Sequence, residues 1–503
     1  MCGIAGFCNF KEDFEENTDY WNFRLEKMRA VLAHRGNDAR GRFLKKHIGL
    51  SHSRLAIRDI LCGDQPMTRT HNGYDYTICY NGEIYNTDEL IPELSENGFV
   101  CSTTSDTEVI LYAYIHWGAD FVNRLNGIFA FAIWDAAKSR LLLYRDRVGV
   151  KPLFYAIRGD SLVFGSEPKA CFAHPAVKPE LDKQGLQELL AIGPAHTSGL
   201  SLFKDLFEVL PGHFMIYSRD GLHDETYWEL TSREHTESYR DTVAHTRFLV
   251  EDAIKRQMVS DVPVCTFLSG GIDSSIVTAI AANYMNTRGK TLNTFSFDFK
   301  DNDRYFKANA FQPERDLPYV NRMLEEYETA HSYLECDENS LFKALFAAVD
   351  AKDMPGMTDV DSSLLYFCSL VSRKNKVALT GECADEIFGG YPWFYRKELL
   401  ERYGFPWSSD VAPRLALLRD DVGLELDLSG YQAFRYEESR SKAPLLYGEA
   451  GEDESRRIIS ISNGSCRRFL TAWIAPACTP SLRPVYLLPT IVSLSMSLMC
   501  LGI

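Results

Sequence analysis

The chain has 503 residues, of which 45% are hydrophobic and 24% are charged, as in ordinary soluble globular proteins. This length favours two large domains, each with enough apolar residues for its own core. The formal net charge of -15 would repel a phosphate backbone, and no basic cluster offsets it, so we expect no nucleic-acid partner.

The cysteines and the N-terminus indicate the compartment. The 13 cysteines are scattered singly from Cys2 to Cys500, without the spacing of a zinc site, which favours reduced thiols. The start MCGIAGF lacks the basic and long apolar regions of a signal peptide. We therefore expect a cytoplasmic protein. Residues 485–503 carry no charge and have the length of a marginal membrane span, but we expect no membrane partner.

The first part of the chain predicts short strands with helices between them. Residues 76–80, 141–144 and 162–164 are typical of strands, and residues 107–116 favour a helix. We expect an α+β domain over residues 2–190. Residues 191–235 have little periodicity and are predicted to link two domains, with a turn at 210–213 before a strand at 214–217.

From about residue 242 the pattern changes to long helical runs between short apolar strands. These strands are predicted at 262–268, 294–297 and 376–379. Alternation of strands and helices predicts a parallel sheet whose ligands bind at the carboxyl ends of its strands. We place this α/β domain over residues 236–460.

Cys2 is a candidate nucleophile. It follows a methionine of the kind that aminopeptidases usually remove, so the mature chain is expected to begin with a thiol beside a free α-amine. Because the pKa of such an amine is near 8 and that of a thiol near 8.5, the amine can take the thiol proton as a general base. Taken alone, Cys2 is more often a small buried residue.

Polar clusters further along supply the other groups that an amide hydrolase needs. Arg54 can hold an α-carboxylate in a fork, while Glu83 and Asp106 can accept hydrogen bonds from an α-ammonium group. Asn81 and the Gly82 amide can donate to a developing oxyanion. Each cluster taken singly is as well explained by a surface ion pair or a hairpin turn.

A family resemblance joins these clusters. The segments MCGIAGF, HRGNDA, HSRLAIRD, NGEIYN, SDTEVIL, LNGIFAFAIWD and RDRVGVKPLFY resemble the class II glutamine amidotransferase domain. The resemblance implies an N-terminal-nucleophile hydrolase fold, an αββα sandwich of stacked sheets between helix layers. It also implies that Cys2 attacks glutamine through a thioester, with Asn81 and Gly82 assisting catalysis. The implied glutamine-binding residues are Arg54, Leu55, Ile57, Asn81, Gly82, Glu83 and Asp106.

The second domain carries a phosphate-binding pattern. In LSGGIDSS, residues 268–275, Gly270 and Gly271 let the backbone approach an anion. Ser269, Ser274 and the amides of the following helix can donate to phosphate oxygens. The segment has neither a GK[ST] ending nor a GxGxxG pattern, which excludes a Walker A loop. A glycine turn with a helix cap is the less specific alternative.

A second segment, TGECADEIFGGY at residues 380–391, follows another predicted strand. It places Glu382, Asp385 and Glu386 near the carboxyl end of the sheet. These carboxylates would repel ATP unless a cation stood between them, so we predict Mg²⁺ held partly by Asp385. An acidic first helical turn would explain two of the carboxylates but not the flanking glycines.

The two segments resemble pyrophosphate-loop ATPases and, more narrowly, asparagine synthetases. The resemblance implies an adenine nucleotide alpha hydrolase-like sheet, with ATP and Mg²⁺ as cofactors. ATP would adenylate the side chain of aspartate, and ammonia would then displace AMP. Glu382 would act near the acyl-adenylate, and the implied metal ligands are Asp273 and Asp385. The implied ATP-binding residues are Phe267, Ser269, Gly270, Gly271, Asp273, Ser274, Phe297, Thr380 and Gly381.

Two alternatives stay open at this point. The chain could amidate a carboxylate other than aspartate, or it could be a glutaminase uncoupled from synthesis. The expected small-molecule partners are glutamine, aspartate and ATP, and a homodimer is a further possibility.

The resemblance stops near Ser460. A one-base shift of reading frame can turn residues 473–479 into MDRTSMY and residues 482–486 into EARVP, both of which resemble the continuation of the family. We therefore predict that residues 461–503 are a frameshift product that packs poorly. A distal lysine of the family that partners the phosphates then has no counterpart, so we expect impaired synthesis beside a competent glutaminase. Sequencing the coding DNA tests this hypothesis.

Overall fold

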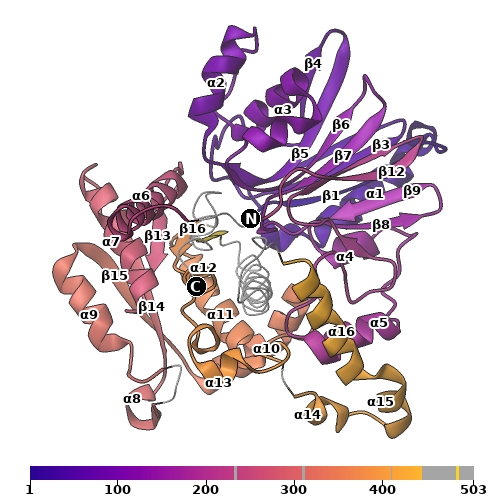
Figure 1. Ribbon diagram of the computed structural model, residues 1–503. Coiled ribbons are helices and arrows are strands. Elements are labelled where there is room, and N and C mark those ends of the chain that lie inside the picture. Colours follow the sequence, from indigo (N-terminus) through magenta and orange to yellow (C-terminus); the bar gives the residue numbers. More distant parts are fainter. Residues whose placement is uncertain (232–234, 309–311, 409, 444–482, 487–503) are drawn as a thin grey trace.

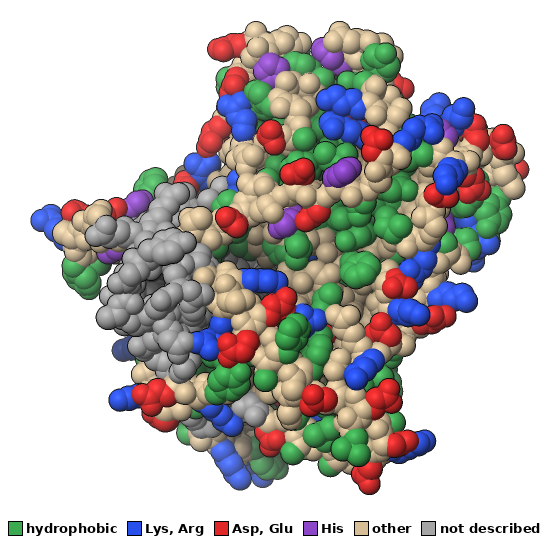
Figure 2. Space-filling model, turned by 45° about the vertical axis from the view of Figure 1, so that its right-hand side comes forward, with side chains coloured by type: hydrophobic (Ala, Val, Ile, Leu, Met, Phe, Trp, Pro, Cys, Tyr) green, Lys and Arg blue, Asp and Glu red, His purple; other side chains and the backbone are tan. Residues whose placement is uncertain are grey.

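The computed structural model describes residues 1–231, 235–308, 312–408, 410–443 and 483–486. Its N-terminal half holds two six-stranded sheets and its C-terminal half one five-stranded sheet. The two halves lie side by side in Figure 1. Acidic and basic side chains are interspersed over the face shown in Figure 2.

The first sheet contains the strand that follows Cys2. Neighbouring strands pair antiparallel in the order β10-β8-β9-β1-β3-β2. Every residue of β1 is buried, because Ile4 and Cys8 face the second sheet while Ala5 and Phe7 face a helix layer. The bounds are β1 Gly3–Asn9, β2 Ala39–Lys45, β3 Ile48–Arg54, β8 Phe154–Arg158, β9 Ser161–Gly165 and β10 Phe207–Glu208.

The second sheet is also antiparallel, in the order β12-β11-β7-β6-β5-β4. Its longest strand, β5, pairs with β6 along most of its length but with β4 only as far as Ile78. After Ile78, the backbone groups on one edge of β5 have no strand beside them and can therefore bond to side chains or a ligand. The bounds are β4 Met67–His71, β5 Tyr74–Ile84, β6 Gly127–Asp135, β7 Arg140–Arg145, β11 His213–Ser218 and β12 Gly221–Thr226.

Helices cover the outer faces of both sheets. A core between the sheets includes Leu50, Leu141 and Met215, while separate apolar clusters join each sheet to its helices. This is the αββα sandwich that the resemblance implies, and the expected fold class is confirmed. Helices α1 Thr18–Ala30 and α4 Pro168–Phe172 lie on the first sheet, and α2 Thr87–Glu96 and α3 Asp106–Trp117 lie on the second.

The segment 191–235, predicted as a linker, contributes to these sheets. Strands β10, β11 and β12 come from it and pair with β8 and β7 of the N-terminal half. Short strands give little periodic signal, and their partners lie far away in the sequence, which is why the pattern indicated a linker. The predicted strand at 214–217 lies within β11.

The C-terminal half is a parallel α/β unit, as expected. Its strands follow the order β15-β14-β13-β16-β17, and every neighbouring pair is parallel. The strands are β13 Val264–Phe267, β14 Leu292–Phe299, β15 Thr329–Cys336, β16 Val377–Thr380 and β17 Arg483–Tyr486. The helices are α6 Tyr239–Gln257, α7 Ile272–Asn286, α8 Asn302–Tyr305, α9 Leu317–Glu326, α10 Glu338–Lys352, α11 Thr358–Val371, α12 Ala384–Phe388 and α13 Lys397–Leu400.

A group of later helices returns to the N-terminal half. Helix α16 packs on the short π-helix Glu188–Ile192 that follows α5, and Arg435 of α16 forms an ion pair with Glu188 at 3.3 Å. Ser408 donates to the carbonyl of Ala191 at 2.7 Å. The bounds are α5 Lys183–Gln187, α14 Ala412–Leu415, α15 Asp420–Leu426 and α16 Leu428–Ser441.

The predicted aberrant tail contains one described strand. The backbone of β17 pairs with β16 from Val377 to Thr380, while poor packing of the tail stays a prediction. An open sheet edge accepts any short extended segment, and proline is tolerated at such an edge. The rest of the tail, including the proposed frame change and residues 487–503 of the apolar run, lies outside the described residues. In the described part, no helix has the length and apolarity needed to cross a membrane.

Candidate functional site

Cys2 lies directly before β1, in the wall of a small pocket. Its Sγ is 3.4 Å from the amide nitrogen of Leu55 and 3.7 Å from the carbonyl oxygen of the same residue. The Cys2 carbonyl accepts a hydrogen bond from Arg35 Nε at 2.9 Å. The Cys2 thiol is therefore held beside Leu55, just after β3. The Cys2 backbone is held separately by Arg35.

The pocket gathers all the residues predicted for the glutamine site. Its volume is about 40 Å³, with Met1 among its lining residues. The predicted residues in its wall are Cys2, Arg54, Leu55, Ile57, Asn81, Gly82, Glu83 and Asp106. The wall also contains Arg58, Gln65, Tyr80, Thr107 and Lys151, which the sequence analysis missed.

Asn81 and Gly82 present two donors to this pocket. Asn81 is 1% exposed, and its Nδ2 has no hydrogen-bond partner among the described residues. Gly82 is opposite Phe129 of β6, whose N–H and carbonyl both bond to Asp146. The Gly82 N–H therefore points away from β6, toward the open edge of β5.

The neighbouring amides confirm this direction. Tyr80 N donates to Gln65 Oε1 at 2.6 Å and Ile84 N donates to Asp106 Oδ2 at 3.1 Å, both on that edge. A Cβ at Gly82 would come within 2.3 Å of a backbone oxygen of Ile128, so this position requires glycine. A buried side-chain amide beside a backbone amide is an arrangement suited to stabilising an oxyanion.

The two arginines of the pocket have different surroundings. Arg54 donates to Asp64 at 2.9 Å and to the carbonyls of Ile60 and Asp59 at 3.1 and 2.5 Å, so it holds the loop after β3 as well as lining the pocket. Arg58, which the sequence analysis missed, donates to the carbonyl of Ile84 at 2.9 Å. Burial lowers the Arg58 pKa, but nearby carboxylates outweigh this and raise it.

The acidic groups of the pocket come from β5 and α3. Asp106 is the first residue of α3, where it accepts hydrogen bonds from Tyr80 Oη at 2.9 Å and from the backbone of Ile84. Glu83 is 5% exposed and lies beside it in the pocket wall. Two buried carboxylates and a nearby guanidinium match the opposite charges of a free amino acid.

Met1 also lines this pocket. It is 2% exposed, and Lys151 Nζ is 2.7 Å from its Sδ. While Met1 is attached, the nitrogen of Cys2 belongs to a peptide bond and cannot act as a base. Removal of Met1 would leave a free amine on Cys2, beside its thiol.

The second site lies at the carboxyl ends of β13, β14 and β16. The loop between β13 and α7 is folded by its own serines, since the hydroxyls of Ser269 and Ser274 are 3.0 Å apart and Ser274 Oγ donates to the carbonyl of Gly271 at 3.1 Å. Gly270 has a φ of +80°, and a Cβ there would come within 2.7 Å of Tyr319. This backbone leaves the first amides of α7 directed at the site.

A pocket of about 490 Å³ opens above this loop, within the range of nucleotide sites. Phe267 and Phe297 form one wall with Phe367 of α11, at centroid distances of 4.7 and 4.9 Å from that ring. The predicted lining residues are Phe267, Ser269, Gly271, Asp273, Ser274, Phe297, Thr380, Gly381, Glu382 and Asp385. Gly270 shapes the loop without lining the pocket, and Val360, Ser363, Leu364, Phe367 and Tyr391 were missed.

Asp273 and Asp385 both line this pocket, close enough for their charges to interact. Burial, together with the charge of Asp385, raises the Asp273 pKa to about 6, and burial raises the Asp385 pKa as well. Two oxygen ligands that repel each other fit Mg²⁺, which is commonly held by one or two carboxylates plus substrate phosphates. No cluster of three or more metal-binding side chains occurs within the described residues, so phosphate and water would complete such a site.

The two sites meet across an apolar interface. Leu55 and Ile57 belong to the same buried cluster as Val264 of β13 and Leu379 of β16. Asp38 Oδ2 accepts hydrogen bonds from the backbone of Ala56 and from Lys376 Nζ, both at 2.8 Å. The loop beside Cys2 is therefore packed directly against the sheet of the second site.

Comparisons with known proteins follow the same division of the chain. A family described as "Glutamine amidotransferase domain" matches residues 1–228, and one described as "Asparagine synthase" matches residues 245–478. The chain is similar to asparagine synthetase [glutamine-hydrolyzing] 3 of Bacillus subtilis, with 47% identity over 91% of this chain and 74% of that protein. It is 32% identical to asparagine synthetase [glutamine-hydrolyzing] 1 of the same organism over 79% of this chain and 60% of that protein.

The chain thus spans between 60% and 74% of the length of these two relatives. Among solved structures, the chain is similar to glutamine phosphoribosylpyrophosphate amidotransferase of B. subtilis complexed with ADP and GMP. That likeness has 16% identity and a TM-score of 0.35, and it covers 67% of this chain and 81% of the other.

Proposed function

The chain belongs to the glutamine-hydrolysing asparagine synthetases, and from this premise we propose that it transfers ammonia from glutamine to the side-chain carboxylate of aspartate, with cleavage of ATP to AMP and pyrophosphate. The observation that carries the proposal is the convergence of Cys2, Asn81, Gly82 and Asp106 on one pocket, from segments far apart in the sequence.

Glutamine hydrolysis begins once Met1 has been removed. The α-amine of Cys2 takes the thiol proton, and Sγ attacks the side-chain amide carbon of glutamine. The developing oxyanion accepts hydrogen bonds from Asn81 Nδ2 and the Gly82 N–H. The proton returns to the leaving nitrogen, ammonia departs and a thioester remains. Water then hydrolyses the thioester to glutamate.

The charges of the pocket orient the substrate. Asp106 and Glu83 accept from the α-ammonium group, and Arg54 pairs with the α-carboxylate. Arg58 lines the same pocket near Asp106 and Glu83, which makes it a further candidate for this pairing. Leu55 and Ile57 line the pocket and also pack against the parallel sheet of the C-terminal half.

The second pocket binds ATP and activates the aspartate side chain as an acyl-adenylate. Ser269, Ser274 and the amides around Gly270 and Gly271 bind the pyrophosphate oxygens, while Phe267 and Phe297 lie against the nucleotide. Asp273 and Asp385 would hold Mg²⁺, whose charge offsets that of the phosphates when it is bound. Thr380 and Gly381 contact ATP, and Glu382 acts near the acyl-adenylate. Ammonia travels internally from Cys2 and displaces AMP.

The decisive experiment measures glutamate, AMP and asparagine together. Cys2→Ala should abolish glutamine-dependent formation of glutamate and asparagine but keep asparagine formation from ammonium salts. Cys62→Ala is the matched control, because Cys62 is exposed and outside the pocket. Full glutamine hydrolysis by Cys2→Ala would refute the assignment of the nucleophile.

The products also separate the alternative functions. AMP formation with another acid in place of aspartate would identify a different acceptor. Glutamate release without asparagine under any condition would identify an uncoupled glutaminase. Mass spectrometry of the active protein should find Cys2 at its N-terminus, and a retained Met1 would contradict the use of the α-amine as base.

A further inference from the structure

Lys151 is a buried lysine of the Cys2 pocket that has no role in the proposed mechanism. Its side chain lines the pocket, although the residue is only 1% exposed. Its Nζ is 2.7 Å from Met1 Sδ, so the charged end of the side chain lies beside the start of the chain. Burial of an ammonium group costs free energy, so this position calls for an explanation.

The backbone of Lys151 is fixed on both sides. Its N–H donates to Asp146 Oδ2 at 2.8 Å, and its carbonyl accepts from Arg145 Nε at 3.0 Å. Arg145 is itself held by the carbonyl of Val209 at 2.6 Å and by Glu208 at 3.0 Å. Burial raises the pKa of Asp146 against the hydrogen bonds and cations around it. The side chain of Lys151 therefore starts from a rigid, buried support.

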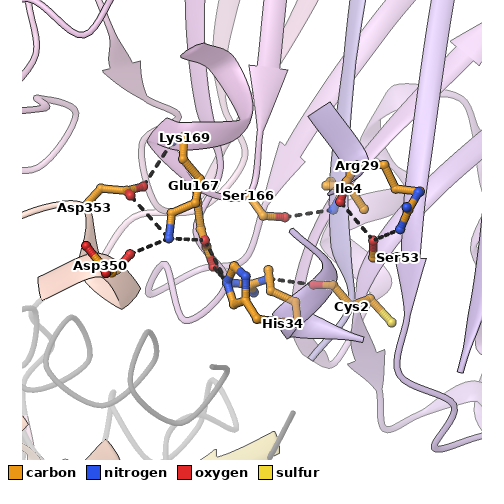
Figure 3. Close-up of polar contacts among 11 residues, drawn as sticks. Cys2, Ile4, Arg29, His34, Ser53, Ser166, Glu167, Lys169, Asp350 and Asp353 are labelled. Atoms are coloured by element: carbon orange, nitrogen blue, oxygen red, sulfur yellow. Dashed lines mark hydrogen bonds and ion pairs between the residues drawn. The ribbon is translucent and has the colours of Figure 1, made fainter. Parts of the chain in front are cut away.

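The backbone of Cys2 is held from another direction. Arg35 donates to the Cys2 carbonyl at 2.9 Å and to Glu167 at 2.6 Å. Figure 3 shows this carbonyl directed at the cluster around Glu167, while the sulfur of Cys2 points away from it. Burial opposes ionisation of Glu167, but Arg35, His34 and Lys169 hold its pKa far below the usual range. The cations of this cluster thus have an ionised partner of their own.

The charges in the pocket wall leave Lys151 as an excess cation. Arg54 and Arg58 match the two carboxylates of the wall, Glu83 and Asp106. Burial lowers the pKa of Arg58, but the charges of Asp106 and Glu83 outweigh this and raise it. The ammonium of Lys151 therefore makes the net charge of the wall positive.

Three other titratable groups in or next to the wall carry no charge near pH 7. Burial raises the pKa of Tyr80 and of Cys79 well above their usual values. It also lowers the pKa of His52, whose Nε2 is 3.1 Å from the carbonyl oxygen of Tyr80, to about 4. These groups neither add to nor offset the charge of Lys151 at neutral pH.

The contact with Met1 limits how far the Lys151 ammonium can lie from the nitrogen of Cys2. Only five covalent bonds separate Met1 Sδ from that nitrogen, so Nζ lies within about 9 Å of it. At this separation, and with an effective dielectric constant of about 20, one cation disfavours a second by an amount equivalent to about one pH unit. Because Lys151 is buried, salt and water screen its charge less than that of a surface lysine.

We propose that Lys151 is a positioning residue whose charge keeps the α-amine of Cys2 unprotonated, and so able to take the thiol proton, at neutral pH. An ordinary α-amine has a pKa of about 8, so most of it is protonated at pH 7 and cannot serve as a base. A neighbouring ammonium disfavours the protonated form. The inference rests on the proposed function and adds the residue that sets its pH range.

The first test measures kcat/KM for glutamine hydrolysis from about pH 6 to about pH 9. Lys151→Met, which keeps the length of the side chain without the charge, should move the acidic limb of the profile upward by about one pH unit. At pH 7 its kcat/KM should fall about fivefold, while at about pH 9 it should equal that of the wild type. Lys151→Arg should keep the wild-type limb, because arginine retains the charge but cannot act as a base.

Lys11→Met is the matched control. It makes the same change of net charge at a side chain that is 75% exposed and lies outside the pocket wall. This variant should keep the wild-type limb. An unmoved limb in Lys151→Met, or an equal shift in Lys11→Met, would overturn the proposal.

A second test needs no catalysis. In Cys2→Ala, whose chain also begins with a small residue after removal of Met1, the rate of acetylation of the α-amine is followed against pH by mass spectrometry of the N-terminal peptide. Adding Lys151→Met should move this titration upward by about one pH unit. The same titration with and without Lys151 would show that its charge does not act on the amine, even if Lys151→Met hydrolyses no glutamine. A wild-type chain that hydrolyses no glutamine would instead refute the proposed function.

Discussion

Asn81 allows a direct test of the oxyanion assignment, because removing its side-chain amide breaks no hydrogen bond of Nδ2 within the described residues. Asn81 Nδ2 is buried without a hydrogen bond among the described residues, at the position where an oxyanion would form. Replacing a single oxyanion donor lowers kcat about 100- to 1000-fold in other enzymes, or about 3 to 4 kcal/mol. We expect Asn81→Ala to lower kcat for glutamine hydrolysis by this factor, with little change in the free energy of unfolding.

Asn86 is the matched control. It is also a buried asparagine, and it lies outside the pocket wall. Its Nδ2 donates to the carbonyl of Arg124 at 3.0 Å and its Oδ1 accepts from Asn126 N at 2.8 Å. Asn86→Ala leaves both of these partners unsatisfied, which costs about 1 to 3 kcal/mol each. We expect it to lower stability while kcat changes little.

The assay combines glutamate release at saturating glutamine with denaturant unfolding of both variants. Asn81→Ala should lower kcat and leave stability unchanged, whereas Asn86→Ala should lower stability and leave kcat almost unchanged. If Asn81→Ala keeps kcat within a few-fold of the wild type, or destabilises the fold as much as Asn86→Ala does, then Asn81 is a structural residue and the oxyanion assignment is wrong.

Three other predictions test separate features. Burial raises the pKa of Glu108, but hydrogen bonds led by Thr103 outweigh it and lower the pKa to about 2. Because this value is below that of the unfolded chain, Glu108 contributes stability above about pH 4.5, and this contribution fades toward pH 2. Glu108→Gln should therefore be less stable than the wild type at pH 7, with a gap in thermal midpoint that narrows over this range; a constant gap would contradict the reasoning. Gly381→Ala places a Cβ within 2.8 Å of Ser274 N, a clash worth about 1 to 3 kcal/mol, and should reduce AMP formation while ATP-independent glutamine hydrolysis persists. Asp273→Asn should reduce AMP formation and raise the Mg²⁺ concentration needed for it, and an unchanged Mg²⁺ titration would remove Asp273 from the metal site.

The sequence by itself determined the fold class and the motifs of both sites. Strong apolar strands such as β7 and β14 were predicted near their observed bounds, because side-chain alternation and burial are local properties. Gly270 was predicted to let the backbone approach an anion, and in the structure it has a φ of +80° with no room for a side chain. Family membership, which the motifs implied, is confirmed by the comparisons. The individual catalytic, binding and metal roles remain proposals.

Only the tertiary structure decided which distant residues share a site. Gln65 reaches the pocket of Cys2 from a loop outside the recognised motifs, and β10 and β11 pair with strands far away in the sequence. Lys169 looks like an ordinary surface lysine until the fold brings Asp353 beside it. Local patterns predict helices and strands, because a helix satisfies its backbone hydrogen bonds within a few residues and a half-buried strand alternates its side chains. Contacts across a long stretch of chain exist only once the complete core has packed, so they left no signal in the sequence.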